Sequence, residues 1–419
     1  IDRNEPVIVG GSEVTILDET DTPLYGTIYL RKGDQKKLKG AFGLFNLLNN
    51  ETAAQEFNYK SSNMSVATVE MNTGQMAAVK EGVSYINVTE AAYTHKEAYI
   101  KVVVLPEKVP AGTTFRPDAV TKAGHSVAVK YDGTLWAWGI NNSGQLGTGN
   151  TDNCDEPVNV TPVKFKAVAA GGMHSLALDS EGNVWFTGTV KGRVTNSFTK
   201  IAGLKDIIEI SAGNEFNLAL DKRGNVYSWG DNSRGQLGIS DNLVYLEEPA
   251  LVPINSVTAI SAGNEHSLFL RSTGEVYAAG NYENARLGVE GASTYIYRPA
   301  KVSKVSSAVA ISAGGAHSAV VTFREDLITF GKNDKGQLGR EGSSSTPSKV
   351  DTLTYISEVS AGEDYTVAMN RDGEAYVSGA NNYGQLGVGD KLNKSAFIRN
   401  TKFTDDNIVL TSVSAGTAL

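Results

Sequence analysis

The hydrophobic positions of this chain alternate with polar positions in short runs rich in Val, Ile, Tyr and Thr, and Gly, Asn or Asp residues bound these runs. Alternation with a period of two is typical of β-strands, because successive side chains point to opposite faces of a sheet. Neither half of the chain shows a long apolar pattern with helical period. The pattern therefore predicts an almost all-β protein.

Glycine is distributed unevenly along the chain. Eight of the 44 glycines fall in residues 1–105, and the other 36 fall in residues 106–419. The change coincides with residues 106–110, a short stretch bounded by two prolines. We therefore predict two domains, the first in residues 1–105 with an N-terminal extension and the second in residues 106–419.

The second domain contains six copies of an internal repeat. Their first positions are His125, His174, Phe216, His266, His317 and Tyr365, at intervals of 49, 42, 50, 51 and 48 residues. Each copy has an alternating strand, a turn and a second strand that ends on Gly, and apolar strands ending in Ala-Gly separate the copies. Four copies continue with Gly-Gln-Leu-Gly, residues 285–288 carry the variant Ala-Arg-Leu-Gly, and the second copy lacks the motif.

The turn inside the hairpin carries a glycine in five of the six copies. These residues are Gly133, Gly182, Gly224, Gly274 and Gly373. A tight turn of this kind requires a positive φ angle, which glycine adopts without steric cost. The fifth copy has Glu325 at this position, and we expect a looser turn there.

A unit of about four short strands that repeats every 40 to 50 residues or so is typical of a β-propeller blade. The hairpin, the Trp-Gly and the Gly-Gln-Leu-Gly elements resemble the repeats of the regulator of chromosome condensation family over about residues 120–416. The resemblance implies a propeller, usually with seven blades. Six copies favour a six-bladed ring, in which the strand at residues 408–416 completes the first copy. Alternatively, residues 119–124 supply that strand and residues 415–416 open a seventh blade.

The first domain has short alternating strands and Gly-containing turns, which predict a small β-sandwich within residues 27–105. Its segments Ser-Ser-Asn at residues 61–63, Ser-Val-Ala-Thr-Val at residues 65–69 and Ala-Val-Lys-Glu-Gly at residues 78–82 resemble the bacterial immunoglobulin-like domain of the group 2 type. That resemblance implies a spacer on bacterial surface and secreted proteins. We expect the apolar residues 41–52 to form a strand pair or a short helix. The predicted fold is an immunoglobulin-like β-sandwich followed by a six-bladed, alternatively seven-bladed, β-propeller.

Composition and charge exclude several classes of partner. The 38 basic and 46 acidic residues give a net charge of −8, which argues against nucleic-acid binding. The apolar run at residues 100–105 is far shorter than the roughly 20 residues that span a bilayer, so we predict no direct membrane insertion. The single cysteine, Cys154, has no flanking His or basic cluster and is interpreted as a thiol without function. Because Ile1 is not an initiator Met and no signal-peptide region follows it, we expect a fragment of a larger surface protein.

Histidine is the first candidate for catalysis or metal binding, yet four of the five histidines occupy one repeat position. Phe216 and Tyr365 replace it in two copies, which favours a packed structural role. The Ser after each His points to the opposite face of the strand, so no Ser-His dyad is expected.

Gly-Gln-Leu-Gly lacks the Lys-Ser or Lys-Thr of a phosphate loop and predicts a turn with a buried Leu. Asp152, Asp155 and Glu156 lack the calcium-loop pattern. We therefore predict no catalytic residue, metal site or cofactor.

Five tyrosines lie outside the repeat frame, in the segments that we predict as loops after the Gly-ended hairpins. They are Tyr245, Tyr282, Tyr295, Tyr297 and Tyr383. Tyrosine supplies a large contact area at low entropic cost, so these side chains are candidates for contact with a partner. The alternative is that they cover neighbouring blades.

These observations favour a non-enzymatic binding or adhesion module that is extracellular or displayed on the bacterial cell surface, and that recognises a protein or glycan through the rim loops of the propeller. The family resemblance implies two alternatives. One is enzyme inhibition, as by a secreted bacterial β-lactamase inhibitory relative, and the other is guanine-nucleotide exchange. Exchange in that family depends on a protruding wedge and inserted loops, for which copies of 42 to 51 residues leave no room.

Overall fold

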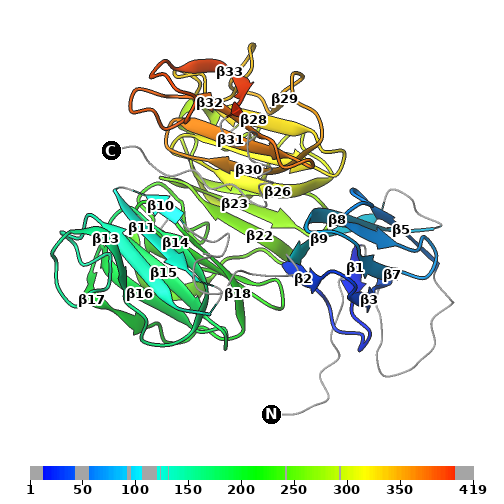
Figure 1. Ribbon diagram of the computed structural model, residues 1–419, viewed down its shortest axis with the longest axis horizontal. Coiled ribbons are helices and arrows are strands. Elements are labelled where there is room, and N and C mark those ends of the chain that lie inside the picture. Colours follow the sequence, from blue (N-terminus) through cyan, green and yellow to red (C-terminus); the bar gives the residue numbers. More distant parts are fainter. Residues whose placement is uncertain are drawn as a thin grey trace. The chain divides into compact units, whose positions relative to one another are not determined.

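The computed structural model describes residues 13–42, 56–91, 96–105, 120–122, 124–130, 132–240, 243–291 and 294–401 (Figure 1). These residues form 33 strands and one short 3₁₀ helix, which confirms the all-β prediction. The chain divides into two compact units, residues 1–107 with residues 272–274, and residues 108–271 with residues 275–419. No helix in the described ranges is long and apolar enough to cross a bilayer.

The first unit consists of three small sheets. A two-stranded sheet pairs β1 (Val14–Leu17) with β4 (Lys39–Phe42). A four-stranded sheet has the order β2 (Thr27–Arg31), β9 (Glu97–Leu105), β8 (Gly82–Glu90) and β5 (Phe57–Ser61). A three-stranded sheet has the order β3 (Gln35–Lys37), β7 (Gln75–Ala78) and β6 (Ala67–Val69). Only the β2–β9 pair is parallel among these strands.

The inward-facing side chains of these sheets form one core. Met76, Ile86 and Val88 are fully buried in it, and Val14 of β1 joins the same cluster. The sandwich therefore begins earlier than residue 27, because β1 supplies part of its core. Of the apolar stretch at residues 41–52, the first two residues extend β4, and the remainder lies outside the described residues.

The second unit contains six sheets among its described residues, and we number them blades 1 to 6 in chain order. Blade 1 comprises β10 (Val120–Lys122), β11 (His125–Val129), β12 (Leu135–Gly139) and β13 (Cys154–Asn159), and blade 2 comprises β14 (Phe165–Ala170), β15 (His174–Asp179), β16 (Val184–Val190) and β17 (Arg193–Lys200). Blade 3 comprises β18 (Ile207–Ala212), β19 (Phe216–Asp221), β20 (Val226–Asp231) and β21 (Tyr245–Leu251).

The last three blades follow the same plan. Blade 4 comprises β22 (Val257–Ala262), β23 (His266–Arg271), β24 (Val276–Asn281) and β25 (Tyr295–Lys301), with the 3₁₀ helix η1 (Glu283–Ala285) before β25. Blade 5 comprises β26 (Ala308–Ala313), β27 (His317–Thr322), β28 (Leu327–Gly331) and β29 (Ser348–Lys349). Blade 6 comprises β30 (Ile356–Ala361), β31 (Tyr365–Asn370), β32 (Ala375–Gly379) and β33 (Lys394–Arg399). Every blade is a four-stranded antiparallel sheet in chain order.

Each blade packs its two innermost strands against the innermost strand of the next blade along the chain, from blade 1 to blade 6. Blade 1 takes its innermost strand from β10, which pairs with β11 over three residues. Val120–Lys122, part of the predicted segment 119–124, therefore supply this strand, as in the second of the two predicted arrangements. The strand predicted at residues 408–416 lies outside the described residues, so a ring of six or seven blades stays a prediction.

The hairpin turns follow the glycine prediction, with φ between 75° and 82° at the five glycines. The expectation of a looser turn in the fifth copy is wrong. Glu325 has φ 63°, and its N–H donates to the Thr322 carbonyl at 2.8 Å, as the N–H of Gly224 does to the Asp221 carbonyl at 3.1 Å. Its buried carboxylate forms an ion pair with Arg371 of blade 6, and this interaction offsets the strain of a left-handed non-glycine residue.

Candidate partner-binding face

Two kinds of loop lie at the same edge of every blade. Antiparallel strands reverse direction at each connection, so the loop between the first and second strands and the loop between the third and fourth strands share one edge. We call it the loop edge. The first kind of loop comprises residues 171–173, 213–215, 263–265, 314–316 and 362–364 in blades 2 to 6. The tight hairpin turns lie at the opposite edge.

The repeated histidines are buried between consecutive blades. Between blades 4 and 5, Ser318 Oγ donates its single hydrogen to the carbonyl of Arg286 at 2.7 Å. His266 Nε2 must therefore be the donor in its 2.9 Å hydrogen bond to Ser318 Oγ. The same chain of bonds joins blades 1 and 2 and blades 5 and 6.

This arrangement confirms the structural role predicted for the histidines, all four of which have no exposed surface at the repeat position. In blades 2, 4, 5 and 6 the Ser or Thr that follows the first position donates to a carbonyl of the preceding blade, so it forms no dyad with the His of its own copy. Burial, reinforced by the positive charge of Lys332, lowers the pKa of His317 to about 3. This imidazole is therefore neutral at physiological pH.

The Gly-Gln-Leu-Gly loops join the blades from the loop edge. Their leucines are buried, as predicted, at Leu146, Leu237, Leu287, Leu338 and Leu386. The carbonyl at the Gln position accepts the hydrogen bond from the Ser or Thr of the next blade. The repeated Ala-Gly also has a reason, because a Cβ on Gly314 of blade 5 would lie 2.5 Å from the Gly362 carbonyl oxygen of blade 6. These motifs therefore serve contacts between blades.

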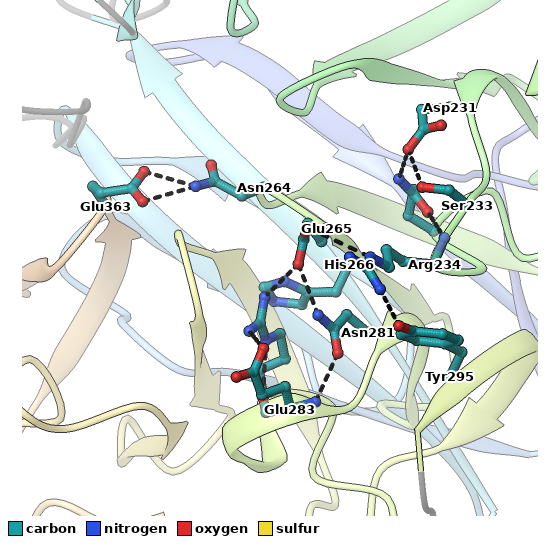
Figure 2. A network of polar contacts seen from close by, with 12 residues as sticks. Asp231, Ser233, Arg234, Asn264, Glu265, His266, Asn281, Glu283, Tyr295 and Glu363 are labelled. Atoms are coloured by element: carbon teal, nitrogen blue, oxygen red, sulfur yellow. Dashed lines mark hydrogen bonds and ion pairs between the residues drawn. The ribbon is translucent and has the colours of Figure 1, made fainter.

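A polar network holds the loop edge of blades 3 and 4 (Figure 2). Glu265 accepts a hydrogen bond from Asn281 Nδ2 at 2.7 Å and lies 3.4 Å from Arg286 Nη1. Arg286 occupies the Gln position of the blade 4 motif and is only 4% exposed. Burial lowers the pKa of its guanidinium, whereas the charges of Glu265 and Glu283 oppose that effect. The network therefore compensates a buried cation and fixes the loops that carry it.

A second link in Figure 2 connects blades 4 and 6. Asn264 Nδ2 donates to both carboxylate oxygens of Glu363, at 2.8 Å each. The Glu363 carboxylate lies close to Gly315 of blade 5, where a Cβ would be only 2.8 Å from Glu363 Oε1. Neither Asn264 nor Glu363 was predicted from the sequence as a site residue. One feature of the sequence could have identified them. The residue two positions before the start of each copy varies, and the residues there are Gly172, Asn214, Asn264, Gly315 and Glu363.

Three of the five candidate tyrosines do not lie in loops, contrary to the prediction. Tyr245 begins β21, and Tyr295 and Tyr297 lie at the start of β25. The cause is the length of the ladders, since Asp231 pairs with Tyr245 and Asn281 pairs with Tyr295. All five candidates nevertheless fall at or next to the loop edge of their blades.

The tyrosines of β21 and β25 contact the preceding blade. The Tyr295 hydroxyl accepts a hydrogen bond from Arg234 of blade 3, and Tyr297 packs edge-on against Tyr295 with 6.2 Å between ring centroids. Tyr245 lies over Gly192 of blade 2, where a Cβ would be 2.6 Å from the tyrosine hydroxyl. These contacts agree with the alternative that such tyrosines cover neighbouring blades, and their contact with a partner stays a prediction.

The remaining two candidates differ sharply in exposure. Tyr282 packs against the core between blades 4 and 5, whereas Tyr383 is 71% exposed. Tyr383 shares its loop, residues 381–393, with Leu392, which is 69% exposed. Asn381 closes this loop, because its Nδ2 donates to the Asp390 carbonyl at 2.8 Å. The loop therefore presents two large apolar side chains in a fixed conformation.

No group of three or more His, Cys, Asp or Glu side chains suited to a metal ion occurs in the described part of the chain. Cys154 lies half-buried at the start of β13 as a free thiol. Asp152, Asp155 and Glu156 are exposed around it.

Comparison with known protein families identifies the propeller. A family model described as the RCC1-like domain matches residues 164–419, which is more than half of the chain. The chain belongs to the RCC1-like domain family. A model of the regulator of chromosome condensation (RCC1) repeat matches residues 132–178, and a model of the bacterial Ig-like domain (group 2) matches residues 29–102. Both predicted family resemblances are confirmed.

Curated relatives share the RCC1-like part of the chain. The ultraviolet-B receptor UVR8 of Arabidopsis thaliana is 29% identical over 70% of this chain and 59% of its own length. The X-linked retinitis pigmentosa GTPase regulator of Homo sapiens is 36% identical over 63% of this chain and 28% of its own length. The E3 ubiquitin-protein ligase HERC2 of Homo sapiens is 27% identical over 68% of this chain, which spans only 5% of that ligase.

Two solved structures share the fold of this chain. Human WBSCR16 gives a TM-score of 0.65 at 22% identity, covering 75% of this chain and 88% of the other. Yeast RCC1 (Prp20), solved with Kap60, gives a TM-score of 0.66 at 19% identity, covering 87% of this chain and 88% of the other. At these identities the similarity establishes the fold, and the predicted β-propeller is confirmed.

Proposed function

We propose that this chain is a non-enzymatic binding module that recognises an extracellular protein or glycan through the loop edge of its propeller. The observation that carries the proposal is the loop at residues 381–393, where Tyr383 and Leu392 are exposed on a conformation held by Asn381. Exposed apolar side chains on a fixed support are typical of contact sites, since little entropy is lost when they bind.

Other features support a binding role at this edge. Met173 of blade 2 and Val244 of blade 3 also expose apolar surface there, at 44% and 67%. Relatives of this fold bind proteins, since one solved structure contains Kap60 bound to yeast RCC1 and another concerns the binding of Prp20p to Gsp1p and histones. The match to the bacterial Ig-like domain supports display on a bacterial surface or secretion.

The test is capture of partners from a bacterial surface extract with the full chain as bait, followed by affinity measurement with the partner so identified. We expect the double variant Tyr383→Ala, Leu392→Ala to weaken binding at least about tenfold while the melting temperature stays unchanged. Leu251→Ala is the matched control, because Leu251 is 55% exposed at the end of β21, at the edge opposite to the loop edge. Tyr295 is a poorer probe, since its bond to Arg234 also joins two blades.

Equal binding by the double variant and the parent chain would contradict the proposed site. Acceleration of nucleotide release from a small GTPase would contradict the non-enzymatic role. Inhibition of a β-lactamase at the same surface would instead assign the partner as an enzyme.

A further inference from the structure

The junction between blades 2 and 3 lacks the loop that every neighbouring described junction uses. Blade 2 has no Gly-Gln-Leu-Gly motif, and only residues 191–192 connect β16 with β17. Elsewhere the carbonyl of this motif accepts a hydrogen bond from the Ser or Thr of the next blade. Blade 3 has Asn217 at the position of this Ser or Thr. Because blade 2 lacks the motif, it offers no motif carbonyl to Asn217.

Three buried N–H donors at this junction have no hydrogen-bond acceptor among the residues that the structure describes. They are Asn217 Nδ2, Trp229 Nε1 and Arg193 Nε. Asn217 has no exposed surface and Trp229 is 2% exposed. The Asn217 amide is directed toward blade 2, because its Oδ1 accepts a hydrogen bond from His174 Nε2 at 2.7 Å. A buried N–H group without an acceptor is costly, so these three donors require an explanation.

The three donors belong to one group of packed side chains. Asn217 and Trp229 are direct partners across β19 and β20, so their side chains lie next to each other on the same face. Trp229 belongs to the same core cluster as Phe186 of blade 2. His174 stacks on Phe186 with 5.7 Å between centroids, and the Arg193 guanidinium carbon lies 5.8 Å from the Phe186 centroid. Phe186 therefore shares a core cluster with Trp229 and lies beside both Arg193 and His174, the hydrogen-bond partner of Asn217.

The chemistry of these donors indicates the kind of ligand. All three offer hydrogens, and one of them belongs to a cation. A water molecule could accept from two of them, but its own hydrogens would then need acceptors in the same place. A carboxylate accepts without donating, and its charge pairs with a guanidinium. We propose that the junction between blades 2 and 3 binds a small carboxylate, whose oxygens take the place of the missing loop carbonyl.

The β16–β17 hairpin carries Arg193, one of the three donors, and is joined to blade 3 by two ion pairs. Lys191 Nζ lies 3.2 Å from Asp231 Oδ1, and Arg193 Nη2 lies 2.9 Å from Glu248 Oε1. The Lys191 and Glu248 side chains are 54% and 63% exposed, so both pairs are weak and screened by salt. A small ligand therefore enters when the hairpin moves, without opening the packed strands of either blade.

The test follows the indole N–H of Trp229 by NMR in the full chain with ¹⁵N-labelled tryptophan, and the Trp229→Phe variant assigns the resonance. Sodium acetate is titrated against sodium chloride of equal ionic strength. We expect a saturable downfield shift of this resonance with acetate alone. The indole N–H resonances of Trp136 and Trp185 should not shift, because these groups already donate to Thr134 and Asp179.

Two variants and a neutral probe make the result decisive. Arg193→Lys keeps the charge but removes Nε–H, and it should weaken acetate binding about tenfold or more, whereas Arg298→Lys on the exposed strand of blade 4 should not. Unchanged indoles of Trp136 and Trp185 show that each variant is folded. Acetate shifts no larger than those of chloride, or an Arg193→Lys variant that binds acetate as the parent does, would overturn the proposal. An equal response to acetamide would overturn the assignment to a carboxylate.

Discussion

The junction between blades 4 and 5 and the junction between blades 2 and 3 are built from the same repeat, yet they differ in what each polar side chain can bond. At the first, His266 donates to Ser318, and Ser318 donates to a loop carbonyl of blade 4. At the second, His174 donates to Asn217, the loop is absent, and Trp229 fills part of the space. The comparison teaches that the residue needed in one copy depends on the motif present in the copy before it.

The largest expected effect comes from breaking the complete junction. His266→Ala removes a fully buried imidazole and its bond to Ser318, and should lower the free energy of unfolding by about 2 to 4 kcal/mol. The measurement is urea unfolding of the full chain. His266→Phe serves as control, because it copies the natural Phe216 of blade 3 and should cost less. An unchanged urea midpoint in His266→Ala would show that these bonds contribute nothing to stability.

An intermediate effect is expected from pH at the junction between blades 5 and 6. His317 has a pKa of about 3 when folded and an ordinary value of 6.5, so the unfolded chain binds a proton first as the pH falls. Stability is therefore complete above pH 6.5 and is lost as the pH falls toward 3. Between pH 6.5 and about 4.5, we expect the parent chain to lose roughly 2 kcal/mol more than His317→Phe. Parallel stability curves for the two proteins would contradict this assignment.

The smallest expected effect on stability concerns the junction between blades 2 and 3, which lacks the loop. Trp229→Phe removes a buried N–H without an acceptor among the described residues and only part of an aromatic side chain. The stabilisation from removing this N–H and the destabilisation from reduced packing nearly cancel. The free energy of unfolding should therefore change by less than about 1 kcal/mol in carboxylate-free buffer. Urea unfolding measures it under the same conditions. A loss as large as that of His266→Ala would mean that the indole N–H has a partner after all.

Sequence reasoning located the strands well, because their alternation follows directly from burial on one face. It placed the hairpin glycines correctly for the same kind of local reason, since their φ angles are a property of the turn itself. Glu325 shows the limit of this reasoning. Its turn keeps the common geometry because Arg371, 46 residues further along the chain, binds its carboxylate. No local pattern contains that contact.

The candidate contact residues divide in the same way. Tyr245 and Tyr295 were identified as residues outside the repeat frame, and the structure shows both packed on the preceding blade. Tyr383 was chosen by the same criterion and is exposed. Whether such a tyrosine is packed or exposed depends on the side chains that the neighbouring blade places at the loop edge. The sequence of a single copy does not specify them.

The sequence by itself determined the repeat, the all-β class, the hairpins with their positive φ angles and the buried leucines, because each depends on residues a few positions apart. The tertiary structure decided which blade satisfies each imidazole, where the Arg286 charge is compensated, and which donors at the second junction lack an acceptor among the described residues. The physical reason is that hydrogen bonds between blades join residues roughly 30 to 100 positions apart. Their energy depends on distance and burial, which a linear pattern does not carry.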